Sequence, residues 1–300
     1  MRILMCSDGS VASEQAAQFA AYLLKAPGHR VTLFGVVEND REAGSIKHSL
    51  DLLFARLRPA RSDVSIKMAR GHAAEEILEE AESGDYDLVV VGDRGRRGLT
   101  RFLLGSTSSR VVQYAPCSVM VVKKSSRELR RILACTAGGE PGLRDVRLAA
   151  RIAAVAESGM TVLHVMSQVA LSDDSDLYDL EASAEELIER GTREGRHLAA
   201  ALDSMAHAGA RGDVRVRHGL VMDEIDSEAR EGGYDLVVVG AHFGRGVSRL
   251  LLDDVTSHVL EALDTAVLVV RDKPSPPPRS DGHPPPSPEP KAQERGEGAG

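Results

Sequence analysis

Two stretches of this chain are nearly the same, and this duplication limits the fold more than any other feature. The residues GDYDLVVVG at 84–92 recur as GGYDLVVVG at 232–240, an offset of 148 residues. At the same offset, VMVVK at 119–123 recurs as VLVVR at 267–271. A repeat of this length has the size of a whole domain, so we expect two similar domains in tandem rather than a short-period solenoid.

The second copy is longer than the first. Near the start of each copy the offset is 129 residues, because ILMC at 3–6 corresponds to ILAC at 132–135. The additional 19 residues are the difference between the two offsets, and they fall after the second expected strand of the second copy. This places the insertion in the acidic stretch around SDDSD at 172–176.

Each copy alternates short apolar runs with amphipathic stretches. In the first copy the runs expected to form strands are residues 2–6, 30–37, 64–68, 88–91 and 119–122. They are nearly continuous, which is typical of strands buried on both faces of a parallel sheet. Helical spacing is present at residues 13–25, 73–82 and 106–114. The alternation predicts doubly wound α/β domains, with right-handed crossovers and helices flanking both faces of each sheet.

Composition excludes several function classes. The formal net charge is −8 and the chain has five Tyr and five Phe, which argues against a nucleic-acid partner. No apolar run approaches the roughly 20 residues that cross a bilayer, so we expect no membrane partner. The three cysteines form no C-x-x-C pair, and the N-terminus does not read as a signal peptide. We therefore expect a cytoplasmic protein without a metal site.

The C-terminal segment differs from both copies. Residues 274–300 contain nine of the thirteen prolines, with many Ser, Gly and Glu residues between them. Such a segment cannot bury enough apolar surface to offset its ordering entropy, so we expect a disordered tail. The predicted organisation is a first domain at 1–126, a second at 127–273 and the tail at 274–300.

A glycine-rich loop follows the fourth expected strand of the first copy and leads to a helix that begins near Ser106. Glycines allow backbone N–H groups to approach a ligand closely, and a helix N-terminus favours an anion. Ser106 and Thr107 add hydroxyl donors. The loop is basic within an acidic protein, since it contains Arg94, Arg96, Arg97 and Arg101. Together these features predict a phosphate-binding site.

The other half of a ligand crevice is expected from the loop after the first strand. In open α/β sheets, ligands lie beyond the carboxyl ends of the strands, where the strand order reverses. Asp8 in this loop can accept hydrogen bonds from a ribose hydroxyl or a base amino group. Val36, near the end of the second strand, would supply an apolar wall.

The spacing Gly92-x2-Gly95-x9-Gly105-Ser106 resembles the ATP-binding signature of the universal stress protein family. The resemblance extends over nearly the whole chain except the tail. It includes the opening at 3–10, the start of a helix at 71–77, and the strands at 87–92 and 119–123.

The resemblance implies a five-stranded parallel sheet in the order 3-2-1-4-5 in each domain. It also implies pairing through strand five and ATP, alone or with Mg²⁺, between strands one and four. By position, Asp8 and Val36 would face adenine or ribose. The residues implied to hold the phosphates are Gly92, Gly95, Gly105, Ser106 and Thr107.

The second copy lacks these features. At the matching positions it has Phe243 for Gly95, Asp253 for Gly105, Asp254 for Ser106 and Ala137 for Asp8. A carboxylate at a helix N-terminus satisfies the free N–H groups and repels a phosphate. We therefore expect nucleotide binding by the N-terminal domain only.

Two functions fit this sequence. The leading hypothesis is a tandem universal stress protein that binds ATP or another adenine nucleotide and acts in stress response or regulation. The alternative is an interaction or scaffold protein of the same fold that binds no nucleotide. The chain contains no G-x-x-x-x-G-K-[ST], G-x-S-x-G or H-E-x-x-H motif, so we do not expect an enzyme. A slow intrinsic ATPase activity is still compatible with the sequence.

Assembly is a further expectation. Strand five of each domain would be an unpaired sheet edge, which is a liability unless it is covered. In a tandem chain the two edges can pair within one molecule, giving an internal pseudo-dimer. Further homodimerisation is left open by the sequence.

Overall fold

A computed structural model describes residues 1–57, 63–94, 104–123, 128–166, 181–241 and 254–272. The acidic insertion around 172–176 and the tail at 274–300 lie outside these ranges.

The first domain contains five strands and four α-helices in the part that the structure describes. The strands are β1 (Arg2–Cys6), β2 (Arg30–Val37), β3 (Asp63–Arg70), β4 (Leu88–Gly92) and β5 (Ser118–Val122). The helices are α1 (Val11–Ala20), α2 (Asp40–Leu57), α3 (Ala73–Ser83) and α4 (Ser106–Tyr114), with a 3-10 turn η1 (Ala21–Lys25) after α1.

The second domain repeats this order with one more helix among its described residues. Its strands are β6 (Arg131–Thr136), β7 (Gly159–Met166), β8 (Arg211–His218), β9 (Leu236–Gly240) and β10 (Ala266–Val270). Its helices are α5 (Gly139–Ala156), α6 (Ala184–Glu189), α7 (Arg193–Ala208), α8 (Val221–Gly232) and α9 (Asp254–Ala262). The extra helix α6 follows the expected position of the insertion.

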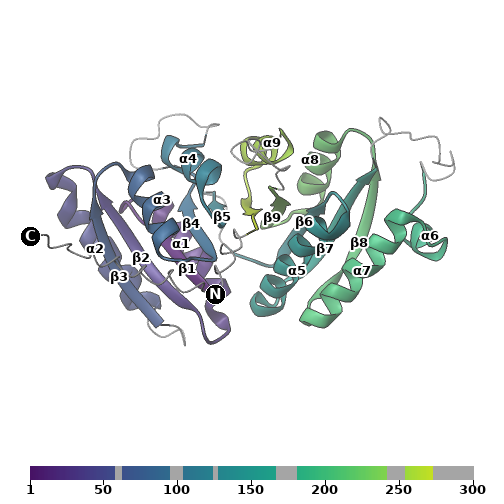
Figure 1. Cartoon of the computed structure of the whole chain (residues 1–300), viewed down its shortest axis with the longest axis horizontal. Helices are drawn as coiled ribbons and strands as arrows, with labels where there is room; N and C mark the ends of the chain where they lie inside the picture. The colour runs from purple at the N-terminus through teal and green to yellow at the C-terminus, as the bar shows by residue number, and fades with distance from the viewer. Residues whose placement is uncertain (58–62, 95–103, 124–127, 167–180, 242–253, 273–300) are drawn as a thin grey trace, which may run out of the picture.

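All ten strands form one continuous sheet, in the order β3-β2-β1-β4-β5-β10-β9-β6-β7-β8 (Figure 1). Within each domain the strands are parallel, and the order 3-2-1-4-5 is confirmed. The two domains meet where β5 and β10 pair in antiparallel register, with Met120 opposite Leu268. The expected pairing of the two fifth strands within one molecule is therefore present. Because this pair is antiparallel, the carboxyl ends of the two sets of strands point in opposite directions.

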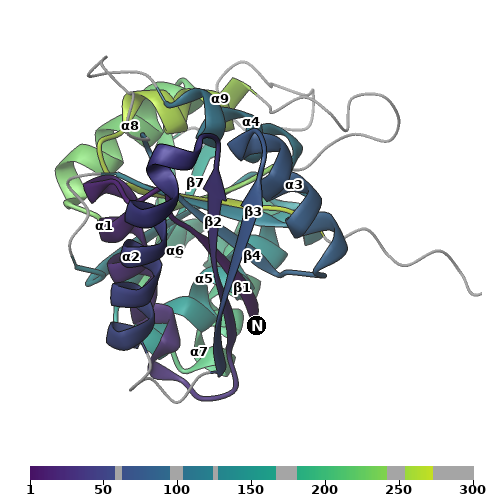
Figure 2. The same ribbon diagram turned by 90° about the vertical axis from the view of Figure 1, so that its left-hand side faces the viewer.

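Helices cover both faces of the sheet, as expected for doubly wound domains. One apolar core lies between the sheet and α1, α2, α5 and α7, and the other lies between the sheet and α3, α4, α8 and α9. Figure 2 looks toward the β3 edge and shows α1 and α2 on one side of the strands, with α3 and α4 on the other. The four central strands β4, β5, β10 and β9 are buried almost throughout, which agrees with their continuous runs of Val.

Three sequence-based expectations need correction. The run at 64–68 is not buried on both faces, because β3 is an outer strand whose Ile66 and Met68 are each 38% exposed. The helix expected at 13–25 begins at Val11 and changes to a 3-10 turn at Ala21. Helix α2 was not expected, although its buried side chains Ile46, Leu50, Leu53 and Leu57 have helical spacing.

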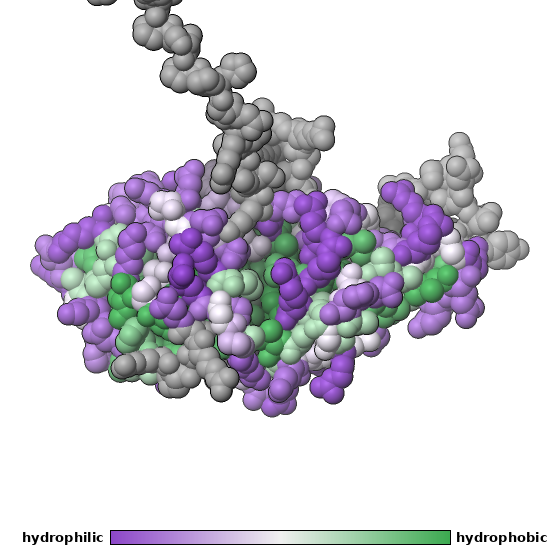
Figure 3. Space-filling view, turned by 60° about the horizontal axis from the view of Figure 1, so that its bottom comes forward, coloured by the Kyte–Doolittle hydropathy of each residue, from purple (hydrophilic) through white to green (hydrophobic). Residues whose placement is uncertain are grey.

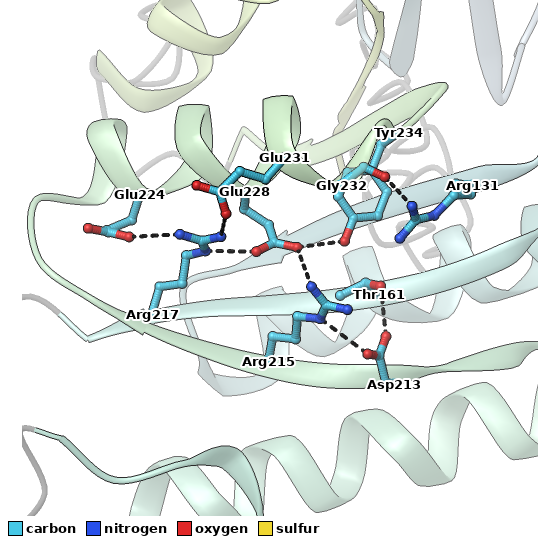
Figure 4. A network of polar contacts seen from close by, with 10 residues as sticks. All are labelled: Arg131, Thr161, Asp213, Arg215, Arg217, Glu224, Glu228, Glu231, Gly232 and Tyr234. Carbon is cyan, nitrogen blue, oxygen red and sulfur yellow. Dashed lines mark hydrogen bonds and ion pairs between the residues drawn. The ribbon is translucent and has the colours of Figure 1, made fainter.

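A buried carboxylate joins α8 to the outer strand β8 of the second domain (Figure 4). Glu228 is 1% exposed, and its side chain accepts hydrogen bonds from Arg215 (3.0 Å), Arg217 (2.7 Å) and the Tyr234 hydroxyl (2.7 Å). Burial alone would raise the pKa of Glu228, but these hydrogen bonds and the two guanidinium charges outweigh burial and lower it. Arg217 also contacts Glu224 and Glu231 on the same helix, so β8 is fastened to α8 by charge as well as by packing.

The first domain has a simpler form of the same contact. Glu80 of α3 accepts a hydrogen bond from the Tyr86 hydroxyl (2.8 Å) and forms an ion pair with Lys67 of β3. The Tyr86 hydroxyl also lies 3.0 Å from the hydroxyl of Thr32 on β2. Both domains thus attach their outer strand to a helix through a buried glutamate and a tyrosine, while only the second uses two arginines.

The described surface and side chains bear on membrane spanning and on metal binding. On the face shown in Figure 3, apolar residues form patches between hydrophilic ones. Within the described ranges, no helix has the length and apolar character needed to span a membrane. The same residues contain no group of three or more His, Cys, Asp or Glu side chains suited to a metal ion.

Candidate functional site

The loop after β1 turns sharply into α1. Gly9 has a φ of +73°, a backbone conformation that favours glycine. One carboxylate oxygen of Asp8 accepts a hydrogen bond from the Ser10 N–H (3.0 Å), and the Ser10 hydroxyl caps α1 by accepting one from the Ser13 N–H (3.2 Å). Asp8 is half-buried. The hydrogen bonds within the loop fix its shape.

A buried group of serines supports this loop from beneath. The hydroxyl of Ser7 lies 3.1 Å from that of Ser13 and 3.3 Å from that of Ser49 in α2. The Ser7 hydroxyl also accepts a hydrogen bond from the Gly9 N–H (3.2 Å). Sequence analysis did not identify Ser49, because nothing in a single sequence connects it to a loop about forty residues away.

Gly92 ends β4 and lies against the start of α1. A Cβ atom at this position would be 3.1 Å from the carbonyl carbon of Ala12 and 3.3 Å from the backbone nitrogen of Ser13. The close neighbour of Gly92 is therefore the backbone of α1. This packing brings the β1 loop and the end of β4 together, which the predicted crevice requires.

Helix α4 begins beside the same strand end. Its N-cap residue is Gly105, with extended φ and ψ of −61° and 148°, and no side chain within the described residues caps it. The Gly105 N–H donates to the carbonyl oxygen of Asp93 (2.8 Å), and the Ser108 hydroxyl donates to that of Gly92 (2.6 Å). These two hydrogen bonds hold the N-terminus of α4 at the carboxyl end of β4.

The first turn of α4 is accessible. Ser106 is exposed and Thr107 is half-buried, and no acidic residue lies in this turn. The free N–H groups of a helix start and its positive dipole end favour an anion. The arrangement can therefore bind a phosphate group.

Charged residues directly follow β4 and β5 at this edge of the sheet. Asp93 is 6% exposed and lies beside Arg94, with 3.6 Å between the carboxylate oxygen and the guanidinium Nε. Burial lowers the pKa of Lys123, the residue after β5, and the nearby Asp93 charge opposes this shift. Sequence analysis missed both Asp93 and Lys123 as neighbours of the site. The only sequence signal for Lys123 is that a second basic residue, Arg271, occupies the matching position of the repeat.

Val36 lies at the same edge of the sheet but is mostly buried. It has an exposed fraction of 8% and belongs to the apolar core beneath α3 and α4. The structure thus brings Asp8, Val36 and Gly92 to the carboxyl ends of three adjacent parallel strands, next to α4. Gly105, Ser106 and Thr107 lie at the start of that helix. Gly95 lies outside the described residues.

The corresponding edge of the second domain is built differently. Ala137 replaces the aspartate, and Thr136 bonds through its hydroxyl to His197 Nε2 (2.8 Å) where Ser7 bonds to Ser49. The ring of His164 lies 6.2 Å from that of His197, between centroids. Burial lowers the pKa of His197, and the charge of His164 lowers it further.

Helix α9 also differs from α4 at its start. Its first residue is Asp254, whose exposed carboxylate stands at the positive end of the helix dipole. Its role as an acid in place of a phosphate is still a prediction. Phe243 and Asp253, the other two substitutions that distinguish this copy, lie outside the described residues.

Comparison with known proteins gives matches to both halves of the chain. The model of the Universal stress protein family matches twice, at residues 1–123 and 128–271. A curated relative, universal stress protein Slr1230 of Synechocystis, is 21% identical over 90% of this chain and 99% of its own. Universal stress protein MJ0531 of Methanocaldococcus jannaschii is 32% identical over 42% of this chain and 84% of its own.

A solved structure that covers most of this chain has the same fold. A universal stress protein from Archaeoglobus fulgidus matches with a TM-score of 0.66 and 16% identity, covering 90% of this chain and 98% of that protein. Another universal stress protein, solved in complex with cAMP, is 27% identical with a TM-score of 0.37, covering 47% of this chain and 97% of its own.

Proposed function

This chain belongs to the universal stress protein family as a tandem pair of its domains, and from that premise we propose that the first domain binds an adenine nucleotide such as ATP. The proposed role is regulation or stress response through nucleotide occupancy, without a dedicated catalytic step. We place this role in the cytoplasm, where reducing conditions suit three cysteines that form no disulfide.

The observation that carries the proposal is the start of α4. Its first turn has no side-chain cap among the described residues and contains no acid, and hydrogen bonds to Gly92 and Asp93 hold it at the carboxyl edge of the sheet. Backbone N–H groups and the helix dipole favour the triphosphate there. Asp8 would then accept hydrogen bonds from ribose or adenine on the neighbouring strand end.

The second domain is proposed not to bind. Asp254 occupies the first position of α9, and Ala137 offers no side-chain acceptor where Asp8 stands in the first domain. A phosphate charge about 4 Å from a carboxylate would be opposed by about 4 kcal/mol at an effective dielectric near 20. This corresponds to roughly a thousandfold weaker binding.

The test is calorimetric titration of ATP with Mg²⁺, and separately of cAMP, into the wild type and into Gly105→Asp. The extended backbone of Gly105 suits an aspartate, which would cap α4 and leave the fold at least as stable. We expect one ATP per chain in the wild type and roughly thousandfold weaker binding in the variant. Gly105→Asn is the matched control, since it has nearly the same shape without the charge.

The outcomes separate the two functions. A stoichiometry near one, lost in Gly105→Asp and largely kept in Gly105→Asn, supports binding at the start of α4. A stoichiometry near two would contradict the inactive second domain. No heat and no rise in Tm at millimolar ATP with Mg²⁺ would favour the scaffold function instead.

A further inference from the structure

Three positively charged side chains cross from one domain to the other, and each reaches the last turn of a helix. Lys25 Nζ donates to the carbonyl oxygen of Ala156 at the end of α5 (3.2 Å). Lys123 Nζ donates to the carbonyl oxygen of Leu260 in the last turn of α9 (2.6 Å). Arg271, which follows β10, does the same for α4. Cations are favoured at helix C-termini, so these contacts stabilise both the helices and the domain pairing.

Arg271 makes the most extensive of these contacts. Its guanidinium donates to the carbonyl oxygens of Val112 (2.5 Å), Gln113 (3.0 Å) and Ala115 (2.9 Å). Its backbone N–H also donates to the hydroxyl of Ser118 at the start of β5 (3.2 Å). Burial lowers the pKa of Arg271 to about 10, so the guanidinium is charged at neutral pH.

Helix α4 therefore connects the proposed phosphate site to the contact with Arg271. It has nine residues, from Ser106 to Tyr114, and spans about 13 Å. Its N-terminus lies at the proposed phosphate site, and its C-terminus is held by a residue of the other domain. Figure 1 shows α4 and α9 close to the junction of the two domains. Any shift of α4 along its axis would move the N–H groups that face the phosphates.

We propose that Arg271 is a positioning residue for the nucleotide site of the first domain. By fixing the C-terminus of α4, Arg271 sets the position of the first turn of that helix. The second domain thus supports the site of the first domain through α4. This inference rests on the proposed nucleotide binding. It gives the second domain a role that does not require a ligand of its own.

Thermodynamic linkage makes the effect reciprocal. If Arg271 strengthens ATP binding, then bound ATP strengthens the hold of Arg271 on α4 by the same factor. The phosphate charge at one end of the helix and the guanidinium at the other are both stabilised by the same dipole. Nucleotide occupancy would then tighten the contact between the two domains.

The experiment compares ATP and adenosine binding to the full chain in three variants. Arg271→Met removes the cation, and Arg271→Lys keeps a charge with fewer donors. Lys25→Met removes a cross-domain contact that does not touch α4. We expect roughly five- to tenfold weaker ATP binding in Arg271→Met. Adenosine, which has no phosphate, should bind as it does to the wild type. Arg271→Lys should recover part of the loss, and Lys25→Met should bind ATP normally.

Hydrogen exchange without nucleotide keeps the inference testable if a variant is unstable. Arg271→Met should speed exchange in α4 more than in α3, and Lys25→Met should leave α4 unchanged. Equal losses for ATP and adenosine, an equal effect of Lys25→Met, or unchanged exchange in α4 would overturn the positioning role. If the wild type binds no ATP, the proposed function falls and the positioning role falls with it. Unchanged ATP binding in Arg271→Met would overturn the positioning role alone.

Discussion

The buried carboxylate of Glu228 offers the sharpest test of how the outer strands are held. In the second domain this carboxylate accepts from Arg215, Arg217 and Tyr234 at 2.7–3.0 Å. Glu228→Gln keeps the shape but replaces one acceptor oxygen with a donor group, which then faces another donor. Glu80→Gln is the matched change in the first domain, where one lysine and one tyrosine contact the carboxylate.

The two losses should differ in size. A hydrogen bond to a charged group contributes about 1.5–3 kcal/mol. The arginine side chains are 44% and 24% exposed, so water replaces part of two such bonds, and we expect Glu228→Gln to cost about 3 kcal/mol. Lys67 is 55% exposed, so we expect Glu80→Gln to cost about 1 kcal/mol. In Tm these correspond to roughly 6–12 °C and 2–4 °C.

The assay is urea and thermal unfolding of the wild type and both variants between pH 7 and pH 3.5. The pKa of Glu228 is lower in the folded state than its ordinary value of 4.5. Its stabilising contribution is therefore complete above that value and is lost as the pH falls through the lower folded pKa. The gap between wild type and Glu228→Gln should shrink below pH 4.5. Equal losses in the two variants, or a gap that does not change with pH, would refute the reasoning.

Two further predictions concern the carboxyl ends of the strands, one in each domain. Burial and the charge of His164 lower the pKa of His197, so the fold should lose stability as the pH falls below the ordinary 6.5. Tm between pH 7.5 and 5.5 should therefore fall less in His197→Gln than in the wild type, and an equal fall would contradict this. Gly92→Ala should cost about 1–3 kcal/mol in urea unfolding, because the new Cβ presses on the backbone of α1. The control is Gly44→Ala in α2, where a new Cβ would meet nothing within 4 Å. We expect this change to stabilise the fold by about 0.5–1 kcal/mol. A loss in Gly44→Ala as large as in Gly92→Ala would rule out the close contact as the cause.

The two domains differ at the carboxyl ends of their strands. Among the described residues, no side chain caps the helix start at the sheet edge of the first domain. The second domain has an acid at that position and a histidine pair near its first loop. The shared features are structural, such as the glutamate–tyrosine contact and the pairing of β5 with β10. The two copies therefore share the contacts that hold the sheet together.

Much of this could be predicted from the sequence, because the relevant signals are local or repeated. The Val-rich runs identify the central strands, and the repeat identifies two domains of one type. The placement of Ser106 and Thr107 at a helix start follows from the glycine-rich loop before them, and the structure places both there. Whether these residues hold phosphate is still a prediction.

Contacts between distant residues were decided only by the tertiary structure. The packing of Gly92 on α1, the support of the β1 loop by Ser49 and the hold of Arg271 on α4 each join segments far apart in the chain. The exposure of β3 follows from its outer place in the sheet. The alternation of apolar and polar residues at 64–68 agrees with a strand that is not buried on both faces. The sequence determined which elements form, because periodicity and turn residues act over a few positions. The fold decided which side chains meet, because that depends on how ten strands are ordered in one sheet.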